Sequence, residues 1–408
     1  AALFLASLAS YLAGMWTSYK NWWPWEKATE VQTAWRSWRA TGYFLPGDTY
    51  ARRKPDAPDE RHAVHDAAAV APGFWAVNRY DPPTQGYVFE LLDEAGTVLN
   101  SFPIDYARIS EGGKPSEFAH IATVLPDGSV LVVWDDAPGM ARLDACGKPI
   151  WSKTDRIYHH SLERGVDGYW TWATDNWYGA EDQDMIRFDP MTGEVLEEIN
   201  LIDDVIEKSP ENRLKLTIPD GYRYKRDSRY GEQADVSHPN DLEELLRGMA
   251  AAFPEFEAGD LLVSLRNIDA LAVIGRRTGE VKWIAYGPWR DQHDADFQPD
   301  GTITVFSNNN DRFHSQIIAV DPKTGASRDL FAGTGLGFDS FIMGKHQHLA
   351  NGNWLITPTI QGRVIEATPE GRIVREYNNI LNADYNALVL YAEHLEPGYL
   401  AKVPACVN

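Results

Sequence analysis

The sequence predicts an all-β fold, a six-bladed β-propeller that follows an N-terminal transmembrane or anchor helix. Three observations predict it: an uncharged apolar stretch opens the chain, short strand-like blocks fill it from residue 62 onward, and one spacing between a histidine and a turn glycine recurs. We divide the chain into an anchor at residues 1–25, a connector at 26–61 and a propeller at 62–408, with an insertion at 203–237.

Residues 1–19 carry no charged side chain, and Trp22, Trp23 and Trp25 lie among the first charged residues. An apolar span of about 20 residues followed by aromatic residues is typical of a membrane helix and its interface. A cleaved signal peptide and a buried amphipathic helix are the alternatives. We expect the bacterial inner membrane, with the propeller on the periplasmic side.

Composition excludes some functions. Lys and Arg number 38 against 59 Asp and Glu, a formal net charge of −21, which repels polyphosphate and argues against nucleic-acid binding. The two cysteines, Cys146 and Cys406, cannot form a disulfide framework or a thiolate zinc site. They leave either one disulfide or two free thiols.

From residue 62 the sequence repeats. Blocks such as GSVLVVWDD, GDLLVSLRN and GTITVFSNN are rich in β-branched and aromatic residues and begin at turn residues. A histidine precedes a turn glycine by eight residues in four pairs, which are His65 and Gly73, His120 and Gly128, His160 and Gly168, and His293 and Gly301.

Two less regular units complete a set of six. One begins at His238 and reaches Gly259 after residues 241–258, in which Leu242, Leu245, Leu246 and Met249 have helical spacing. The other has Gly344 eight residues before Gly352. A β-sandwich is the alternative fold, but it does not account for the repeat.

In a propeller the first strand of each blade is expected to be innermost, so one register of that strand faces the central channel. A histidine occupies this register in five units, at His65, His120, His160, His238 and His293. In the sixth unit, His346 and His348 lie two and four residues after Gly344. Several buried imidazoles around one channel are costly unless they bind an anion or a metal. Side chains that point inward from different blades converge poorly on one tetrahedral metal, so an anion fits them better.

Several ordered segments resemble the arylsulfate sulfotransferase family. They are SHPNDLEEL, GDLLVSLRN, QHDADFQPDGTITVFSNNNDR and GKHQHLANGNWLITP, within residues 236–378. The resemblance implies a metal-free enzyme without cofactors, in the bacterial periplasm, that moves a sulfuryl group between phenols by a ping-pong mechanism. Its substrates would be small aryl sulfates and phenols, and one histidine would be transiently sulfated.

The residues of this sequence that match the family's motifs are expected to have the roles that the family assigns to those positions. The resemblance implies catalytic roles for His238 in HPN, His293 in QHD and Arg312 in NNNDR. The nucleophile belongs in the last part of the propeller, where His346 and His348 are available. The register and the same motifs add the substrate-binding candidates His160, His120 and Asn310.

These residue types suit sulfuryl transfer. A neutral imidazole can attack sulfur, a guanidinium such as that of Arg312 can hold the sulfate oxygens, and a histidine such as His293 or His238 can donate to them or act as an acid. The charged insertion could form a lid or a solvated loop. Two other functions remain open: a non-catalytic propeller that docks in a membrane complex, and a hydrolase or lyase that uses a metal.

Overall fold

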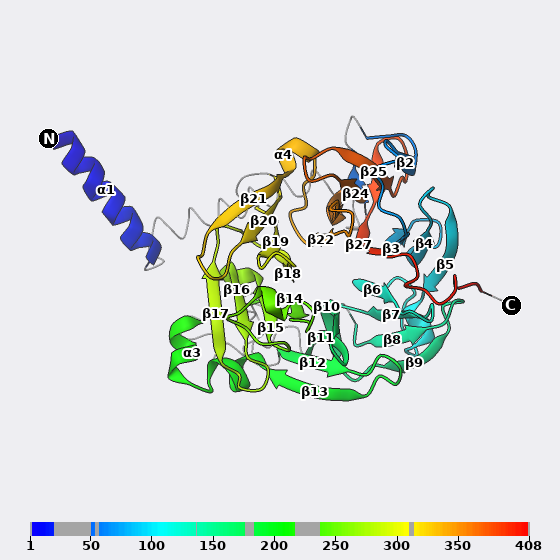
Figure 1. Cartoon of the computed structure of the whole chain (residues 1–408), viewed down its shortest axis with the longest axis horizontal. Coiled ribbons are helices and arrows are strands. Elements are labelled where there is room, and N and C mark those ends of the chain that lie inside the picture. Colours follow the sequence, from blue (N-terminus) through cyan, green and yellow to red (C-terminus); the bar gives the residue numbers. More distant parts are fainter. Residues whose placement is uncertain are drawn as a thin grey trace.

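The computed structural model describes residues 2–19, 50–53, 57–135, 137–175, 183–216, 237–309 and 314–406. In these residues six antiparallel sheets stand around a common axis, as Figure 1 shows. The predicted six-bladed β-propeller is therefore confirmed.

The first three blades are given from the innermost strand outward. Blade 1 consists of β27 (Val389–Leu395), β3 (Phe74–Asp81), β4 (Gly86–Leu92) and β5 (Val98–Ile104). Blade 2 consists of β6 (Ile121–Val124), β7 (Val130–Val133), β8 (Met140–Leu143) and β9 (Pro149–Lys153). Blade 3 consists of β10 (Ile157–Gly165), β11 (Gly168–Thr174), β12 (Asp184–Phe188) and β13 (Val195–Asn200).

The other three blades follow the same order. Blade 4 consists of β14 (Pro239–Glu244), β15 (Leu261–Leu265), β16 (Ala270–Ile274) and β17 (Val281–Tyr286). Blade 5 consists of β18 (His293–Phe297), β19 (Ile303–Ser307), β20 (Gln316–Val320) and β21 (Ser327–Ala332). Blade 6 consists of β22 (Lys345–His348), β23 (Trp354–Thr357), β24 (Arg363–Ala367), β25 (Ile373–Asn378) and a fifth strand, β2 (His62–Val64).

A short pair of strands and several helices complete the described elements. Strand β1 (Tyr50–Arg52) pairs with β26 (Tyr385–Ala387). The helices are α1 (Ala2–Tyr19), η1 (Tyr106–Arg108), η2 (Leu201–Ile206), α3 (Pro210–Lys215), η4 (Ala250–Ala252), η5 (Arg266–Ile268), α4 (Gly333–Leu336) and η6 (Thr359–Gln361).

Strands from both ends of the propeller sequence close the ring. The last strand, β27, is the innermost strand of blade 1, and β2 pairs with the outer strand β25 of blade 6. His65 follows β2, and its Nε2 lies 2.9 Å from Glu376 Oε1 on β25. The prediction that His65 faces the centre is therefore wrong, because its repeat unit supplies no inner strand.

Apolar packing joins each blade to the next. Among the described residues, six buried clusters form, one between each pair of neighbouring blades. Between blades 3 and 4, for example, Trp170 and Trp172 of β11 pack with Leu261 and Val263 of β15. Full burial of such a side chain contributes about 1.5–3 kcal/mol, so the contacts between blades hold the inner strands in place.

The expected N-terminal helix forms as α1, apart from the blades in Figure 1. Its apolar side chains, among them Phe4, Leu5 and Tyr11, are exposed. Over the part of the chain that the structure describes, no helix is long and apolar enough to cross a membrane, so the predicted anchor is not confirmed. Residues 20–49 and 54–56, which include most of the predicted connector, lie outside the described residues.

One expectation, for the chain between β14 and β15, needs correction. Residues 241–258 do not form the helix that their leucine spacing suggests, since β14 extends to Glu244 and only the short η4 follows. Strand pairing decides here, because Leu242 opposes Val263 of β15 and is buried between blades.

The described part of the 203–237 insertion covers the rim of blade 4. Asn212 Nδ2 donates to Gly279 O at 2.9 Å, and Lys215 Nζ donates to Val281 O of the outer strand β17 at 2.7 Å. Figure 1 shows α3 beside β17 at the outside of the ring. This portion is therefore not a lid, and residues 217–236 lie outside the described residues.

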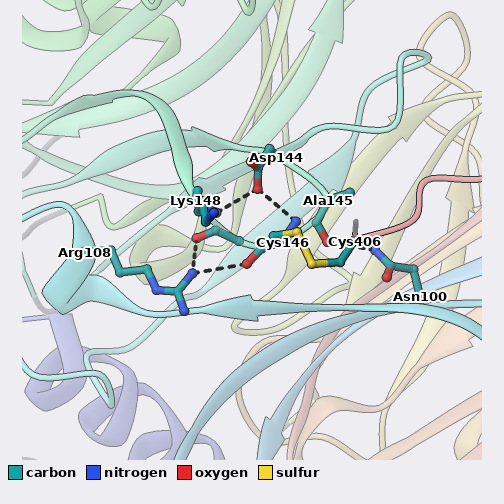
Figure 2. Close-up of a disulfide and its surroundings, with 8 residues drawn as sticks. Asn100, Arg108, Asp144, Ala145, Cys146, Lys148 and Cys406 are labelled. Carbon is teal, nitrogen blue, oxygen red and sulfur yellow. Dashed lines mark hydrogen bonds between the residues drawn. A yellow bond between two sulfur atoms is a disulfide. The ribbon is translucent and has the colours of Figure 1, made fainter. Parts of the chain in front are cut away.

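A disulfide joins Cys146 to Cys406, across 260 positions of sequence. Figure 2 shows how the turn around Cys146 is held. Asp144 Oδ1 accepts the N–H groups of Cys146 and Lys148 at 2.8 and 2.9 Å, and Arg108 Nη1 donates to Cys146 O at 3.1 Å. The bridge thus fastens the segment after β27 to the outer hairpin of blade 2.

Candidate functional site

Four of the predicted histidines gather where the inner strands begin. His120 directly precedes β6, His160 lies on β10, His238 directly precedes β14 and His293 begins β18. The ring of His160 is 5.0 Å from that of His120 and 4.9 Å from that of His238, centroid to centroid. We call these four residues the histidine cluster.

The backbone at this register is unusual. The φ angle is positive at His160 (59°), His238 (44°) and Asp294 (55°), although none of these residues is glycine. The pairing register also shifts in β10, β14 and β18 at this level. Left-handed residues and β-bulges re-aim side chains and are concentrated at functional sites, so the same distortion in three blades marks the site.

Asp135, which follows β7, joins blades 2 and 3 at the cluster. Its Oδ2 lies 2.5 Å from His120 Nδ1, and its Oδ1 accepts the backbone N–H of His160 at 3.3 Å. Next to it, Nδ1 of His159 and Nδ1 of His160 are 2.7 Å apart and share one hydrogen bond. Sequence reasoning missed Asp135; its position in the VVWDD run, directly after a strand, was the available indication.

His293 is held in one tautomer by its neighbours. Its Nδ1 donates to Asn308 Oδ1 at 2.7 Å, with the carbonyl of Asp291 at 3.1 Å. Its Nε2 therefore accepts, and the backbone N–H of Met343 lies 3.3 Å away. Asn308 was also missed by sequence reasoning, although it belongs to the FSNNN run.

Burial and neighbouring groups keep two of these rings neutral. Burial lowers the pKa of His160 well below its usual value, and the nearby His238 and His159 lower it further. Burial also lowers the pKa of His293, followed by the positive charge of Arg266. A neutral imidazole retains a lone pair at pH 7, which is the form that attacks an electrophile.

His346 and His348 lie elsewhere. The ring of His346 stacks on Trp354 with 5.7 Å between centroids, while its Nδ1 is 2.6 Å from Asp294 Oδ2 and its Nε2 is 2.7 Å from Thr304 Oγ1. His348 stacks on the same tryptophan at 4.6 Å. The prediction that both histidines face the centre is wrong, because the residues of β22 that alternate with them point inward. The catalytic role of His346 and His348 stays a prediction.

The residue of β22 that reaches the axis is Lys345. Its Nζ lies 2.6 Å from Asp294 Oδ1, 3.1 Å from Asp241 Oδ1 and 3.3 Å from Glu163 Oε1. These carboxylates belong to blades 5, 4 and 3. Lys345 therefore links the inner strands of four blades. It lies on that side of the histidine cluster where acidic residues accumulate.

Three more carboxyl groups, those of Glu243, Asp296 and Glu393, lie on the inner strands β14, β18 and β27. Burial raises the pKa of Glu243 and of Asp296 well above the usual range, and burial raises the pKa of Glu393 to about 7. Nearby carboxylates are a further cause of the increase in each of these pKa values.

Two groups of described residues bring possible metal-ligand atoms within 4.8 Å of one another. One group is His120, Asp135 and His160, and the other is Asp294, Asp296 and His346. In each group a carboxylate oxygen lies within hydrogen-bond distance of a histidine Nδ1. This geometry is that of a hydrogen-bonded carboxylate and imidazole pair, and we assign no metal to either group.

Arg312 and Asn310, the predicted sulfate clamp and one substrate-binding candidate, lie outside the described residues. Their roles remain predictions. Among the described residues, Arg266 at the start of η5 is a cation close to the cluster, since its charge lowers the pKa of His293 and its backbone N–H donates to His238 O at 3.1 Å.

The chain is similar to several solved structures, at low sequence identity. A crystal structure of a protein of unknown function from Bacteroides caccae is 12% identical, with a TM-score of 0.50, and the match covers 78% of this chain and 99% of that one. TolB from Acinetobacter baumannii is 12% identical with a TM-score of 0.46, covering 78% and 65%. Virginiamycin B lyase from Staphylococcus aureus is 12% identical with a TM-score of 0.40, covering 80% and 88%.

The sequence comparison is more specific. No curated protein matches the chain. The family described as arylsulfotransferase (ASST) matches residues 122–380, which include His160, His238, His293 and the strands that carry them. The match spans more than half of the 408 residues, and the chain belongs to the arylsulfotransferase family.

Proposed function

We propose that this protein transfers a sulfuryl group from an aryl sulfate to a phenol through a sulfated histidine of the histidine cluster. The observation that carries the proposal is the gathering of four imidazoles, three of which, His160, His238 and His293, lie within the matched family segment. Imidazoles can supply both the nucleophile and the donors that a sulfate ester needs.

His160 is the proposed nucleophile. It lies between His120 and His238, and burial lowers its pKa so that the ring is neutral at pH 7. Attack on sulfur forms an N–S bond while the S–O bond to the aryl group breaks, and the electron pair of that bond goes to the departing aryl oxygen. An acceptor phenol reverses these steps, which gives ping-pong kinetics.

The chemistry also needs cationic donors for the sulfate oxygens. Arg312 remains the proposed clamp on the strength of its motif, and Arg266 adds a second positive charge near His293. Oriented donors of this kind typically contribute about 100-fold to 1,000-fold in rate, because they stabilise charge that develops in the transition state.

The test is mass spectrometry of the purified protein after brief exposure to 4-nitrophenyl sulfate, kept under non-acidic conditions. We expect nitrophenol release and one sulfuryl adduct on His160, with both lost in His160→Ala. An adduct on His346 or His348 would instead support the nucleophile predicted from the sequence. Neither release nor adduct would overturn the enzyme and favour a non-catalytic subunit that docks in a membrane complex.

We also propose that the protein resides at the bacterial inner membrane with the propeller on the periplasmic side. Two features support this proposal: α1 is uncharged and exposes large apolar side chains, and a disulfide is typical of an oxidising compartment. Cell fractionation of the full chain and of a chain lacking residues 1–19 tests it. Equal recovery of both in the soluble periplasmic fraction would contradict the membrane assignment.

A further inference from the structure

His120 and Asp135 form a buried pair at the edge of the histidine cluster. The two atoms His120 Nδ1 and Asp135 Oδ2 are 2.5 Å apart, and the two residues are only 3% and 6% exposed. A hydrogen bond between an imidazole and a carboxylate is strong when water is excluded. The pair is therefore a fixed unit and not a surface contact.

The surroundings fix the orientation of this pair from both sides. Asn78 Nδ2 donates to Ala119 O at 2.8 Å and to His120 O at 3.3 Å, which holds the backbone of His120. The other oxygen of Asp135 accepts the backbone N–H of His160. The carboxylate thus places His120 relative to the proposed nucleophile, and the two rings meet edge to face at 5.0 Å.

The hydrogen bond also determines the tautomer. An ionised carboxylate only accepts, so Nδ1 of His120 carries a proton and Nε2 is the nitrogen that exchanges protons with a reacting group. In serine hydrolases the same arrangement of carboxylate and histidine moves a proton to and from oxygen. Sulfuryl transfer between phenols needs such a proton transfer in each half of the reaction.

We propose that His120 is the general acid and base of the reaction and that Asp135 is its positioning residue. The inference rests on the proposed function. For this step Nδ1 and Nε2 of His120 must both carry a proton at the start, and the Asp135 carboxylate balances the charge of that imidazolium. In the first half, the S–O bond to the aryl group breaks, the departing oxygen takes the proton from Nε2, a neutral phenol leaves, and His120 is left neutral with its proton on Nδ1. In the second half, the acceptor phenol returns a proton to Nε2 while its oxygen forms a bond to sulfur and the N–S bond breaks.

The test compares two donors that differ in their need for an acid. The leaving group of 4-nitrophenyl sulfate is a stable anion that departs without a proton, whereas phenyl sulfate releases a much more basic phenolate. For His120→Gln we expect kcat with phenyl sulfate to fall about 100-fold to 1,000-fold, the usual contribution of acid catalysis. The loss with 4-nitrophenyl sulfate should be at least ten times smaller, by the same reasoning.

Asp135→Asn is the second variant, because it keeps the shape of the side chain and removes the charge. It should show the same preference for the nitrophenyl donor, since an amide can donate to His120 Nδ1 and stabilise the wrong tautomer. The matched control is His65→Gln, a histidine at the outer edge of blade 6, which should leave both rates unchanged. Added imidazole should partly restore His120→Gly with phenyl sulfate.

The outcomes separate the two proposals. The acid and base role would be overturned if folded His120→Gln and Asp135→Asn lost equal activity with both donors. Full activity in either variant would also overturn it. In both cases the proposal of sulfuryl transfer would stand. If His120→Gln does not fold, the donor preference of Asp135→Asn decides. Failure of the unaltered protein to release phenol from either donor would overturn the proposed function and this inference together.

Discussion

The ammonium group of Lys345 lies 2.6 Å from the carboxylate of Asp294, where the inner strands of blades 6 and 5 approach the propeller axis. Asp241 and Glu163 contact the same ammonium from blades 4 and 3. The Lys345 side chain is 9% exposed, so this contact lies in a poorly hydrated centre. A single buried cation thus balances carboxylates from three blades.

Replacing this lysine should destabilise the fold. Lys345→Met leaves Asp241 and Asp294 buried without their cation, and removal of one partner of a buried ion pair typically costs about 3–5 kcal/mol. We expect a loss of this size in the free energy of unfolding, measured by urea denaturation. Lys323→Met, at an exposed turn, is the control and should change little. An unchanged midpoint for Lys345→Met would contradict the prediction.

Stability should also fall as the pH rises. Burial raises the pKa of Glu393 to about 7 in the folded protein, from 4.5, so the folded state binds the proton more tightly than the unfolded state does. The stability from this group is complete below pH 4.5 and is lost as the pH rises through 7. Glu393→Gln should therefore be more stable than the unaltered protein at pH 8, by about 3 kcal/mol.

Thermal unfolding at pH 5, 6, 7 and 8 measures this difference. The gain from Glu393→Gln should shrink toward zero near pH 5, because the native carboxyl group is then protonated. Thr123 and Val124, which donate to this carboxylate, also donate to the amide oxygen. A gain that does not vary with pH would show that packing, and not titration, is responsible.

The disulfide should stabilise ring closure. Cys146 and Cys406 are separated by 260 positions, and removal of a crosslink that closes a long loop typically costs about 2–4 kcal/mol. We expect Cys146→Ser with Cys406→Ser to lower the free energy of unfolding by that amount. The same loss should follow reduction of the unaltered protein, and reduction of the double variant should have no effect. Equal stability of both proteins would mean that strand pairing and apolar packing suffice.

Arg266 should tune the protonation of His293. Burial is the main reason that the pKa of His293 is low, and the Arg266 charge is the next cause. Arg266→Met removes that charge, so the pKa of His293 should rise while it stays below 6.5, because burial persists. NMR titration of the histidine rings measures the change, with Arg328→Met on the exposed strand β21 as control. A lower or unchanged pKa would contradict the electrostatic contact.

Arg312→Ala should abolish sulfuryl transfer without unfolding the protein. The expectation comes from the NNNDR motif and from the need of a sulfate ester for paired donors. Turnover of 4-nitrophenyl sulfate and thermal unfolding, measured on the same preparation, separate loss of activity from loss of structure. Turnover at the rate of the unaltered protein would remove Arg312 from the mechanism.

The repeat in the sequence was sufficient to predict the blades. Turn glycines such as Gly128 and Gly301 adopt positive φ, and the strands between them pair as antiparallel sheets. These features are local, since a turn that needs positive φ selects glycine and a half-buried strand selects its own residue types. For the same reason His120, His160, His238 and His293 were found at one level.

Only the tertiary structure decided which side chains meet. His346 was expected at the axis, but Met343 and Gly344 both take positive φ before β22, and Lys345 faces the axis instead. A change of one residue in register turns every side chain of a strand to the other face. Likewise, the pairing of β27 with β3 placed His65 at the rim, and the packing of blade 2 on blade 3 brought Asp135 to His120. The sequence by itself determined the fold and the imidazoles, while register and packing between blades determined their partners, because those contacts join residues that no local pattern relates.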